Sequence, residues 1–368
     1  MQDFSNSPLR IGVIGAGNWA KEAHVPAFRL APATKVVAIC DVDGDRAATV
    51  AAQAAIPAFY ADVREMLEAE KLDAVSVVTP DDAHVAPVIE ALQRGLHVLC
   101  EKPLATTVED AAMLARRGRE AGVVTRMGFT MRAAPAMLQL RSLVAGGAVG
   151  RPHLLQAFQQ NGQFLDPSAP FHWKMDGSRT GGGAIVEYGI HTLDLARWIM
   201  GEATGVSATS LTQVAERPGP GGRMAPIEVD DATAWLMEFP GAIATCHAGW
   251  ATAGRPPGVE IRVFGSEGAV RCLLSDDLAD AQGLWLAGRD GAFAPLPVSA
   301  PEDVIGPWWT RFPALLVREF VAAIRGQPGE GADFDDGLQA QVLLEAVQRA
   351  AADRRWIEPA QPRPVTQS

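Results

Sequence analysis

The sequence feature that most constrains the fold is a glycine-rich turn that joins an apolar strand to a helix near the start of the chain. The strand is predicted at Leu9–Ile14, and residues 15–20 have the sequence GAGNWA. Gly15 permits a tight turn, Gly17 leaves room for a ligand beside the backbone, and Ala20 lets the helix pack closely on the strand. The N–H groups at the start of such a helix suit phosphate groups. The pattern predicts a dinucleotide-binding strand–turn–helix unit.

An acidic residue stands where such a unit contacts the ribose of a dinucleotide. Asp41 follows the second predicted strand, residues 35–40, and comes 24 positions after Gly17. Its carboxylate can accept hydrogen bonds from both ribose hydroxyls and repels a 2′-phosphate, which favours NAD over NADP. Asp43 is an alternative for the ribose contact, and Arg46 offers a positive charge that tolerates the phosphate. NAD is therefore the expected cofactor, with NADP as the alternative.

The order of apolar runs along the chain predicts two domains. In the first third, strand-like runs alternate with helical segments, a pattern typical of a parallel sheet covered by helices. After about Arg132 strand-like runs dominate, and they lie at residues 152–159, 205–214, 232–239, 242–250 and 259–265. We expect an α/β Rossmann domain over residues 1–128. An α+β domain with a large, mostly antiparallel open sheet is expected over residues 129–368.

Composition excludes several classes of function. The 368 residues carry a formal net charge of −11, so the surface repels nucleic-acid phosphates and no nucleic-acid partner is expected. We see no leader peptide and no apolar run of the ~20 residues that span a bilayer. The prediction is a soluble, cytoplasmic protein without membrane contact. The scattered cysteines predict reduced, buried thiols and no metal site; they are Cys40, Cys100, Cys246 and Cys272.

Further motifs follow the glycine-rich turn along the chain. They are Thr79-Pro80 with His84, Glu101-Lys102-Pro103, Trp173-Lys174, Gly181–Ala184, and residues 187–198 with Glu187 and His191. Together they resemble the glucose–fructose oxidoreductase, inositol dehydrogenase and rhizopine-catabolism (Gfo/Idh/MocA) family, from about residue 9 to about residue 351. The resemblance implies a Rossmann domain followed by an open sheet domain, and binding of NAD or NADP. It also implies a sugar or cyclic polyol substrate, and a homodimer or homotetramer formed through the sheet face.

The turn and the resemblance together predict the site residues. Predicted cofactor contacts are Gly15, Gly17, Asn18, Trp19 and Asp41, and by resemblance Thr79, Pro80, His84, Glu101 and Lys102. By resemblance Lys102 is the catalytic lysine, and Glu187 and His191 match the acidic residue and the histidine of the catalytic set. Predicted substrate contacts are Lys102, Trp173, Lys174, Glu187 and His191. Two residues depart from the family pattern, since Glu187 more often is aspartate and Lys174 often is arginine.

These residue types suit oxidation of a carbinol, which loses a hydride to nicotinamide and a proton from its hydroxyl. The Lys102 amine can bind the reacting oxygen, and the imidazole of His191 can exchange the proton near neutral pH. Glu187, four residues earlier on a helix, would share a face with His191 and hydrogen-bond it. The alternatives are a surface lysine paired with Glu101, a core histidine, and Asp194 as a further carboxylate.

Other features leave alternatives open. Gly181–Gly183 would either approach the substrate or form a flexible connector. Trp250 and Arg132 are weaker site candidates, and Trp308-Trp309 would shape either an interface or the far wall of the site. Besides a sugar or polyol dehydrogenase or reductase, the sequence is compatible with two other functions. One is a non-catalytic NAD(P)-binding regulatory protein. The other is an enzyme that holds NAD permanently and acts by transient oxidation, as a glycosidase or a sugar–sugar oxidoreductase.

Overall fold

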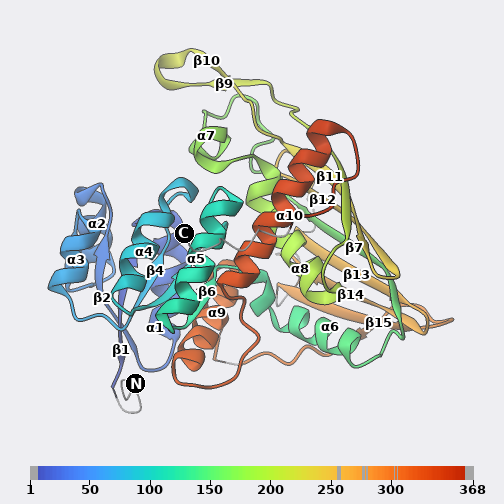
Figure 1. The fold of residues 1–368 in the computed structure, drawn as a ribbon, viewed down its shortest axis with the longest axis horizontal. Coiled ribbons are helices and arrows are strands. Elements are labelled where there is room, and N and C mark those ends of the chain that lie inside the picture. Colours follow the sequence, from blue (N-terminus) through green and yellow to red (C-terminus); the bar gives the residue numbers. More distant parts are fainter. Residues whose placement is uncertain are drawn as a thin grey trace, which may run out of the picture. The chain divides into compact units, whose positions relative to one another are not determined.

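The computed structural model describes residues 7–254, 258–275, 278, 281–301, 303, 304 and 306–360. The chain forms two compact units (Figure 1). The first comprises residues 1–133 and 301–338, and the second comprises residues 134–300 and 339–368. Our predicted boundary after residue 128 divided the chain consecutively, whereas a late segment of the chain returns to the first unit.

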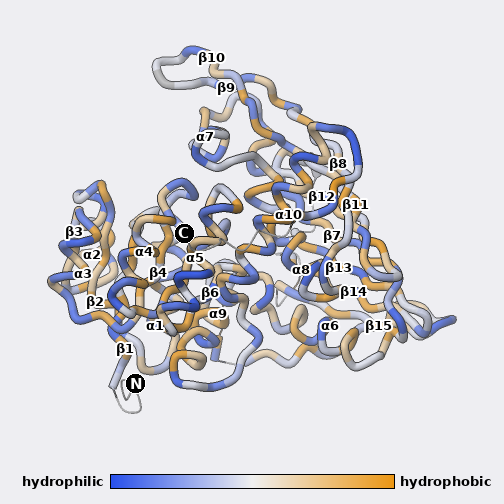
Figure 2. The backbone as a smooth tube through the Cα atoms, in the orientation of Figure 1, coloured by the Kyte–Doolittle hydropathy of each residue, from blue (hydrophilic) through white to orange (hydrophobic). Residues whose placement is uncertain are grey.

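A six-stranded parallel sheet forms the centre of the first unit, and it confirms the predicted Rossmann architecture. Its strands are β1 (Leu9–Ile14), β2 (Thr34–Cys40), β3 (Ala58–Tyr60), β4 (Ala74–Val77), β5 (His97–Cys100) and β6 (Thr125–Met127). They stand in the order β3-β2-β1-β4-β5-β6. Figure 2 shows hydrophobic stretches along β2 and β4, as expected for strands that are buried on both faces. The strand order reverses between β1 and β4, and ligands of such sheets bind at that point.

Helices connect these strands, and local sequence sets their ends. They are α1 (Val25–Leu30), α2 (Gly44–Gln53), α3 (Val63–Ala69), α4 (Val85–Gln93) and α5 (Val108–Ala121), with the short turns η1 (Ala20–His24), η2 (Asp81–Ala83) and η3 (Thr130–Ala133). At the start of α5 the Thr107 hydroxyl accepts the N–H of Asp110, and Gly122 ends the helix with φ of 64°. Both ends follow from residue preferences, because threonine caps N-termini and glycine adopts left-handed φ.

The late segment joins the first unit through α9 (Trp308–Ile324), which packs on α1, η1 and η3. Its apolar face contributes Val317 and Phe320 to a core that also contains Ile11 and Phe28. Each fully buried side chain of this kind stabilises the fold by about 1.5–3 kcal/mol. Burial of this helix face therefore explains why a segment far along the sequence belongs to the first unit.

The second unit contains an eight-stranded sheet in the order β16-β15-β14-β13-β7-β12-β11-β8. Its strands are β7 (Pro152–Gln160), β8 (Gly205–Leu211), β11 (Ala232–Phe239), β12 (Ala242–Gly249), β13 (Gly258–Gly265), β14 (Gly268–Leu274), β15 (Gln282–Gly288) and β16 (Ala294–Leu296). The β7–β12 pair is parallel and the other pairs are antiparallel, which confirms the predicted open sheet. A separate hairpin pairs β9 (Glu216–Pro218) with β10 (Met224–Pro226).

The remaining helices belong wholly or mostly to the second unit. They are α6 (Pro135–Ala145), α7 (Gly177–Thr180), α8 (Ile190–Met200) and α10 (Phe334–Asp353), with the short turns η4 (Trp173–Met175), η5 (Ile185–Gly189) and η6 (Pro220–Gly222). Among them, α6 contacts β14 and β15, while η5 and α8 contact β7 and β12. The sheet thus fixes the position of the start of α8 through contacts with β7 and β12. Among the described residues, the helices are too short or too polar to pass through a bilayer.

Candidate cofactor and active site

The glycine-rich turn lies directly after β1, at the carboxyl edge of the parallel sheet. Gly15 has a φ of 102°, and a Cβ there would stand 2.4 Å from the Val78 carbonyl oxygen, so only glycine fits. A Cβ on Gly17 would meet no atom within 4 Å, and Asn18 beside it is exposed. Gly15 is therefore required by the protein's own packing. The open side of Gly17 fits the close approach of a pyrophosphate.

Asp41, at the carboxyl end of β2, is held in place by backbone groups of the turn. Its Oδ2 accepts the N–H of Ala16 at 2.8 Å, and its Oδ1 accepts the N–H of Asp43 at 2.9 Å. The competing carboxylate of Asp43 caps α2 and pairs with the Arg46 guanidinium at 2.9 Å. Asp41 is thus a preorganised acceptor at the turn. Asp43 has partners within its own helix, which favours Asp41 for the ribose contact.

Thr79 and His84 follow β4 and belong to the same edge of the sheet. The His84 ring is fully buried, and its nitrogens lie 2.7 Å from the Pro103 carbonyl oxygen and 3.0 Å from that of Thr79. Burial lowers the pKa of His84. His84 therefore connects the segments after β4 and β5, and we interpret its role as support for the site. The Thr79 hydroxyl is buried without a hydrogen-bond partner among the described residues, so it offers a polar group to a ligand.

Glu101 and Lys102 follow β5. The Glu101 carboxylate lies 2.8 Å from His24 Nε2 and accepts the Trp19 indole N–H at 2.9 Å. Burial opposes ionisation of Glu101, but the contacts with His24, Lys102 and Trp19 outweigh it and lower its pKa to about 2. The backbone N–H of Lys102 points to the same carboxylate at 3.2 Å, and the Lys102–Pro103 peptide is cis. An ionised carboxylate thus stands beside the predicted catalytic lysine.

These residues of the first unit fit a dinucleotide. The open backbone at Gly17, the fixed Asp41 carboxylate and the unsatisfied Thr79 hydroxyl follow β1, β2 and β4, whose carboxyl ends share one edge. Trp19, by contrast, uses its indole N–H for Glu101. Its predicted contact with the cofactor would therefore come from the ring and not from that N–H.

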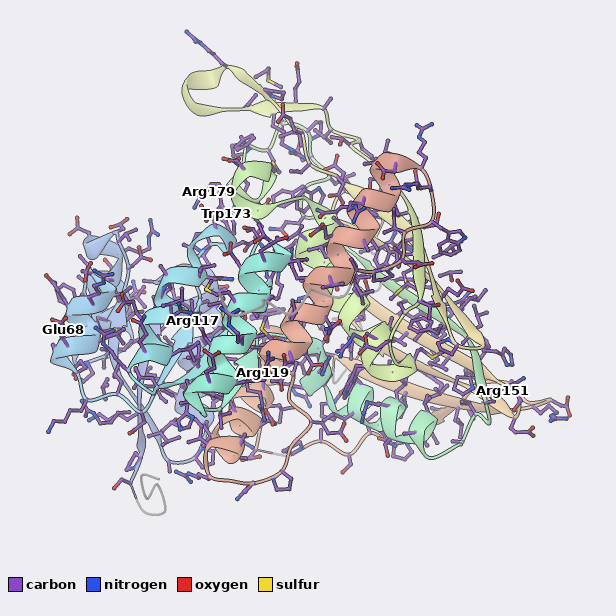
Figure 3. All side chains as sticks on the ribbon, in the orientation of Figure 1. Glu68, Arg117, Arg119, Arg151, Trp173 and Arg179 are labelled. Carbon is purple, nitrogen blue, oxygen red and sulfur yellow. The ribbon has the colours of Figure 1, made fainter. Side chains whose placement is uncertain are left out.

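The second unit brings together Trp173, Lys174 and Glu187. The Lys174 ammonium forms an ion pair with the Glu187 carboxylate, in a partly buried position. The Trp173 ring has the Arg179 guanidinium 5.6 Å from its centroid, and Figure 3 labels this pair beside α7. Positive groups and an aromatic face thus lie next to a carboxylate, a combination that suits the hydroxyls and C–H faces of a sugar.

His191 lies in the first turn of α8 and is 7% exposed. Glu187 precedes it in η5, a turn of π-helix, whereas we predicted one continuous helix for both. Within this turn the Ile185 side chain lies against Gly189, where a Cβ would stand 2.4 Å from Ile185 Cδ1. Such π-turns are common at functional sites. The Glu187 carboxylate forms an ion pair with Lys174.

Gly181–Gly183 have a structural reason that neither of our two predictions included. A Cβ on Gly183 would stand 2.0 Å from the Asp230 carbonyl oxygen. The Asp230 carboxylate also accepts the N–H groups of Gly183 and Ile185, each at 2.9 Å. Burial raises the pKa of Asp230. Gly183 therefore lets the backbone lie directly against Asp230, whose carboxylate holds the start of η5.

Three other candidates have mainly packing contacts. Trp250 is fully buried, with its indole N–H donated to Asp231. Arg132 is nearly buried and pairs with Asp336 at 3.2 Å. Trp308 lies in the first unit, 6.3 Å from the Trp19 ring, so it stands near the glycine-rich turn.

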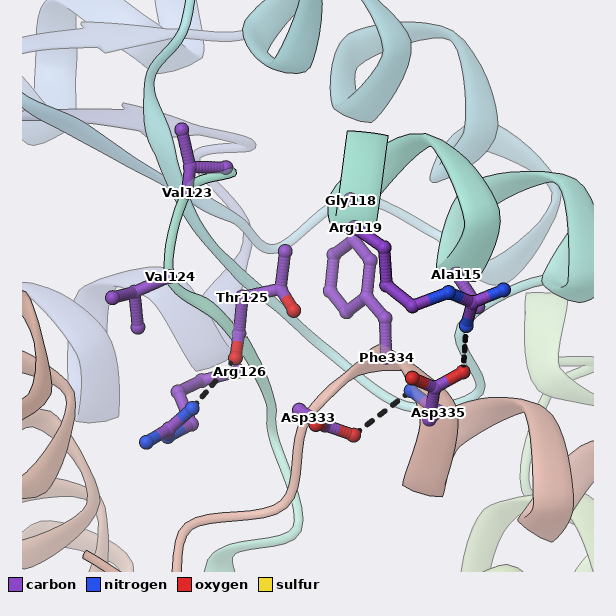
Figure 4. A pocket seen from close by; sticks show the side chains of 10 residues that line it. All are labelled: Ala115, Gly118, Arg119, Val123, Val124, Thr125, Arg126, Asp333, Phe334 and Asp335. Atoms are coloured by element: carbon purple, nitrogen blue, oxygen red, sulfur yellow. Dashed lines mark hydrogen bonds and ion pairs between the residues drawn. The ribbon is translucent and has the colours of Figure 1, made fainter. Parts of the chain in front are cut away.

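Sequence reasoning missed His24, Ser76 and Asp230. Each is a single polar residue inside an apolar stretch, and the only signal was that a buried polar group needs a partner. The structure also contains a hollow of about 270 Å³ in the first unit, lined mainly by α5, β6 and residues 333–335 (Figure 4). Arg119 and Asp335 form an ion pair there. None of the residues that line this hollow belongs to the glycine-rich turn.

Comparison with protein-family models finds two matches that together cover most of the chain. Residues 9–129 match the model of an oxidoreductase family with an NAD-binding Rossmann fold. Residues 137–271 match the model of the GFO/IDH/MocA C-terminal domain.

Similar proteins extend over nearly the whole chain. A levoglucosan dehydrogenase of Pseudarthrobacter phenanthrenivorans is 26% identical over 95% of this chain and 98% of its own length. A 1,5-anhydro-D-fructose reductase of Ensifer adhaerens is 31% identical over 93% of this chain and 96% of its own length. The solved structure of levoglucosan dehydrogenase with NADH and L-sorbose has a TM-score of 0.88 at 25% identity, covering 97% of this chain and 100% of that chain.

Proposed function

The chain belongs to the Gfo/Idh/MocA oxidoreductase family and is therefore an NAD-dependent oxidoreductase, and we propose that it transfers a hydride between NAD and a carbinol or ketone carbon of a sugar or cyclic polyol. One observation carries the proposal. The glycine-rich turn, Asp41 and Lys102 follow the carboxyl ends of three strands of one parallel sheet, the edge at which such sheets bind ligands.

NAD held at this edge supplies the hydride acceptor or, when reduced, the donor. The backbone at Gly17 would hold the pyrophosphate, and Asp41 would accept the ribose hydroxyls. The Thr79 hydroxyl would find in the cofactor the partner that it lacks. A carboxylate at position 41 disfavours a 2′-phosphate, so NAD is preferred over NADP. Arg46, 3.5 Å from Asp41, keeps limited use of NADP open.

Lys102 would bind the oxygen at the reacting carbon. Its positive charge stabilises the alkoxide character that develops as the hydride leaves, which is the usual effect of a cation placed at a developing negative charge. Glu101 lies next to it with a pKa of about 2, so it stays ionised at any working pH. Its negative charge attracts the neighbouring Lys102 ammonium.

His191 would take the hydroxyl proton during oxidation and return it during reduction, since imidazole exchanges protons near neutral pH. The reaction then balances, because the carbinol loses a hydride to NAD and a proton to His191. Glu187 would bind another substrate hydroxyl together with its partner Lys174. The Asp230 carboxylate holds the start of η5, and with it Glu187, by accepting the N–H groups of Gly183 and Ile185.

The substrate class rests on the relatives and on the residues of the second unit. The similar proteins are named for levoglucosan, anhydrofructose and myo-inositol, which are all sugars or polyols. The partly exposed Trp173 offers an aromatic face to sugar C–H groups, and Lys174 offers a hydrogen-bond donor. We therefore propose a ring-shaped polyhydroxy compound as the substrate.

The test is a panel of sugars, anhydrosugars and inositols, incubated with NAD or NADP while the absorbance of reduced nicotinamide is recorded. The expected result is turnover of at least one compound with NAD, and a loss of about 10³-fold or more in Lys102→Met. Lys35→Met, at an exposed position, is the matched control and should retain activity. No turnover of any compound in either direction would refute the proposed function. Tight NAD binding without turnover would then favour a regulatory protein, and turnover without added NAD an enzyme that retains its cofactor.

We further propose that a second copy of the chain covers the sheet face opposite α8. On that face Leu236 of β11 and Ile243 of β12 are 45% and 52% exposed, and His247 of β12 stacks on Phe158 of β7. A group of exposed apolar side chains on adjacent strands is typical of an oligomer interface. A homodimer or homotetramer is expected, measurable by analytical ultracentrifugation. The proposal includes a cytoplasmic location, supported by four unpaired, buried cysteines.

A further inference from the structure

A chain of buried polar groups runs beneath the glycine-rich turn. The Ser76 hydroxyl lies 2.8 Å from His24 Nδ1, and His24 Nε2 lies 2.8 Å from Glu101 Oε1. The same carboxylate oxygen accepts the Trp19 indole N–H at 2.9 Å. Ser76 is fully buried, and His24 is only 2% exposed. These groups were not among the predicted catalytic residues, and the hydride transfer described above does not use them directly.

At its carboxylate end the donor in this chain can be assigned, because an ionised Glu101 only accepts hydrogen bonds and His24 must donate from Nε2. At the other end, His24 Nδ1 and the Ser76 hydroxyl can be hydrogen-bond partners in either direction, so every group has a partner. The order serine–histidine–carboxylate is that of hydrolytic triads, but substrate cannot reach a serine with no exposed surface. The chain is therefore a support for Glu101.

The Glu101 carboxylate has little freedom to move. A Cβ on Gly128 would stand 2.5–2.7 Å from three atoms of this carboxyl group, so the carboxylate rests directly against the Gly128 backbone. Its second oxygen faces the backbone N–H of Lys102 at 3.2 Å. One buried carboxylate thus contacts the glycine-rich turn through Trp19, the core through His24, and the lysine segment through Lys102.

We propose that His24 is a positioning residue for catalysis: it fixes the Glu101 carboxylate, which in turn holds the backbone of Lys102 and, through Trp19, the glycine-rich turn. The cofactor turn and the catalytic lysine are then placed relative to each other by one buried anion. The inference rests on the proposed role of Lys102. Loss of His24 should loosen Lys102 more than it weakens NAD binding, whereas loss of the Trp19 N–H should act mainly on the turn.

Steady-state kinetics with the substrate found in the panel test this proposal. His24→Leu keeps a similar volume but removes both ring nitrogens, and His24→Gln keeps a donor toward Glu101. We expect His24→Leu to lower kcat about 10- to 100-fold, the effect of one charge-assisted hydrogen bond, with KM for NAD changed less than about threefold. His24→Gln should recover most of kcat, and Trp19→Phe should mainly raise KM for NAD. Wild-type kcat in His24→Leu, or equal losses in both His24 variants, would overturn the proposal.

A second measurement does not depend on turnover. The chain has five lysines, so acetic anhydride labelling at pH 8 can be followed for each by peptide mass spectrometry. An ammonium that loses a nearby carboxylate releases its proton more readily and is acylated faster. Labelling of Lys102 relative to the exposed Lys35 and Lys71 should rise about three- to tenfold in Glu101→Gln, and in the same direction in His24→Leu. An unchanged ratio in both variants would refute the positioning role.

The two experiments separate this inference from the proposed function. If the wild-type protein turns over no substrate but the labelling ratio rises, the proposed function fails and the positioning of Lys102 stands. If the wild-type protein is active but neither kcat nor labelling responds to His24, the function stands and the positioning role is wrong. Glu101→Gln serves as the test variant if His24→Leu does not fold.

Discussion

Replacing Glu101 by glutamine should make the first unit less stable at neutral pH, and the deficit should shrink in acid. The carboxylate is 7% exposed and has contacts with His24, Trp19 and the Lys102 backbone. These contacts lower its pKa from 4.5 to about 2. Glutamine has the same shape but no charge, so it removes the part of the stability that depends on ionisation.

The sign and the size follow from the pKa. A carboxyl group whose pKa is lower in the folded than in the unfolded state contributes stability above the unfolded pKa, and this contribution is lost as the pH falls through the folded pKa. A decrease from 4.5 to about 2 corresponds to about 3 kcal/mol at pH 6. By the same relation about 1 kcal/mol remains at pH 3, and nearly all is lost below pH 2.

The assay is urea unfolding of both proteins at pH 6 and pH 3, followed by tryptophan fluorescence. The difference in unfolding free energy between wild type and Glu101→Gln should be about 2 kcal/mol larger at pH 6 than at pH 3. Any effect of the new amide that does not depend on pH cancels in this comparison. Glu68→Gln is the control, since that side chain is 73% exposed and should give no such difference. An equal difference at both pH values would show that the ionised Glu101 carboxylate does not stabilise the fold in this way.

Three further changes test other parts of the structure. Asp41→Ala should lower kcat/KM with NAD about 10- to 100-fold, because the acceptor for the ribose hydroxyls is lost. It should also reduce the preference for NAD over NADP, because the repulsion of the 2′-phosphate is lost. Initial rates with each cofactor measure both effects. Gly183→Ala should destabilise the second unit by about 3 kcal/mol, because its Cβ would stand 2.0 Å from the Asp230 carbonyl oxygen. Calorimetry should show this loss of stability. The control Gly288→Ala should show no loss, because a Cβ there meets no atom within 4 Å. Ile243→Glu should shift the sedimentation coefficient to that of a monomer, and an unchanged coefficient would rule out the proposed sheet interface.

Much of the fold was predictable because its signals are local. The strands β1 and β11 have the predicted bounds, and the ends of α5 at Thr107 and Gly122 follow from the conformational preferences of threonine and glycine. The return of α9 to the first unit was not predictable. An amphipathic helix shows that it has an apolar face, but the sequence does not say which core will bury that face.

The site was predictable only in part, for the same reason. Gly15, Gly17 and Asp41 form a local pattern, and the structure places them at one edge of the sheet. His24 and Asp230 act through contacts with residues far along the chain, Glu101 and Gly183, and a local sequence pattern does not identify such distant partners. The π-turn at Glu187 also escaped prediction, since the residues that require it differ little from those of an α-helix.

A crystal structure of the complex with NADH and an unreactive analogue of the best substrate would test the proposed roles of Lys102 and His191. We expect that Lys102 Nζ and a ring nitrogen of His191 both lie within about 3.2 Å of the same substrate oxygen. If either group lies beyond about 6 Å from that oxygen, or if the oxygen is not on the carbon that faces the nicotinamide, the proposed catalytic roles are wrong.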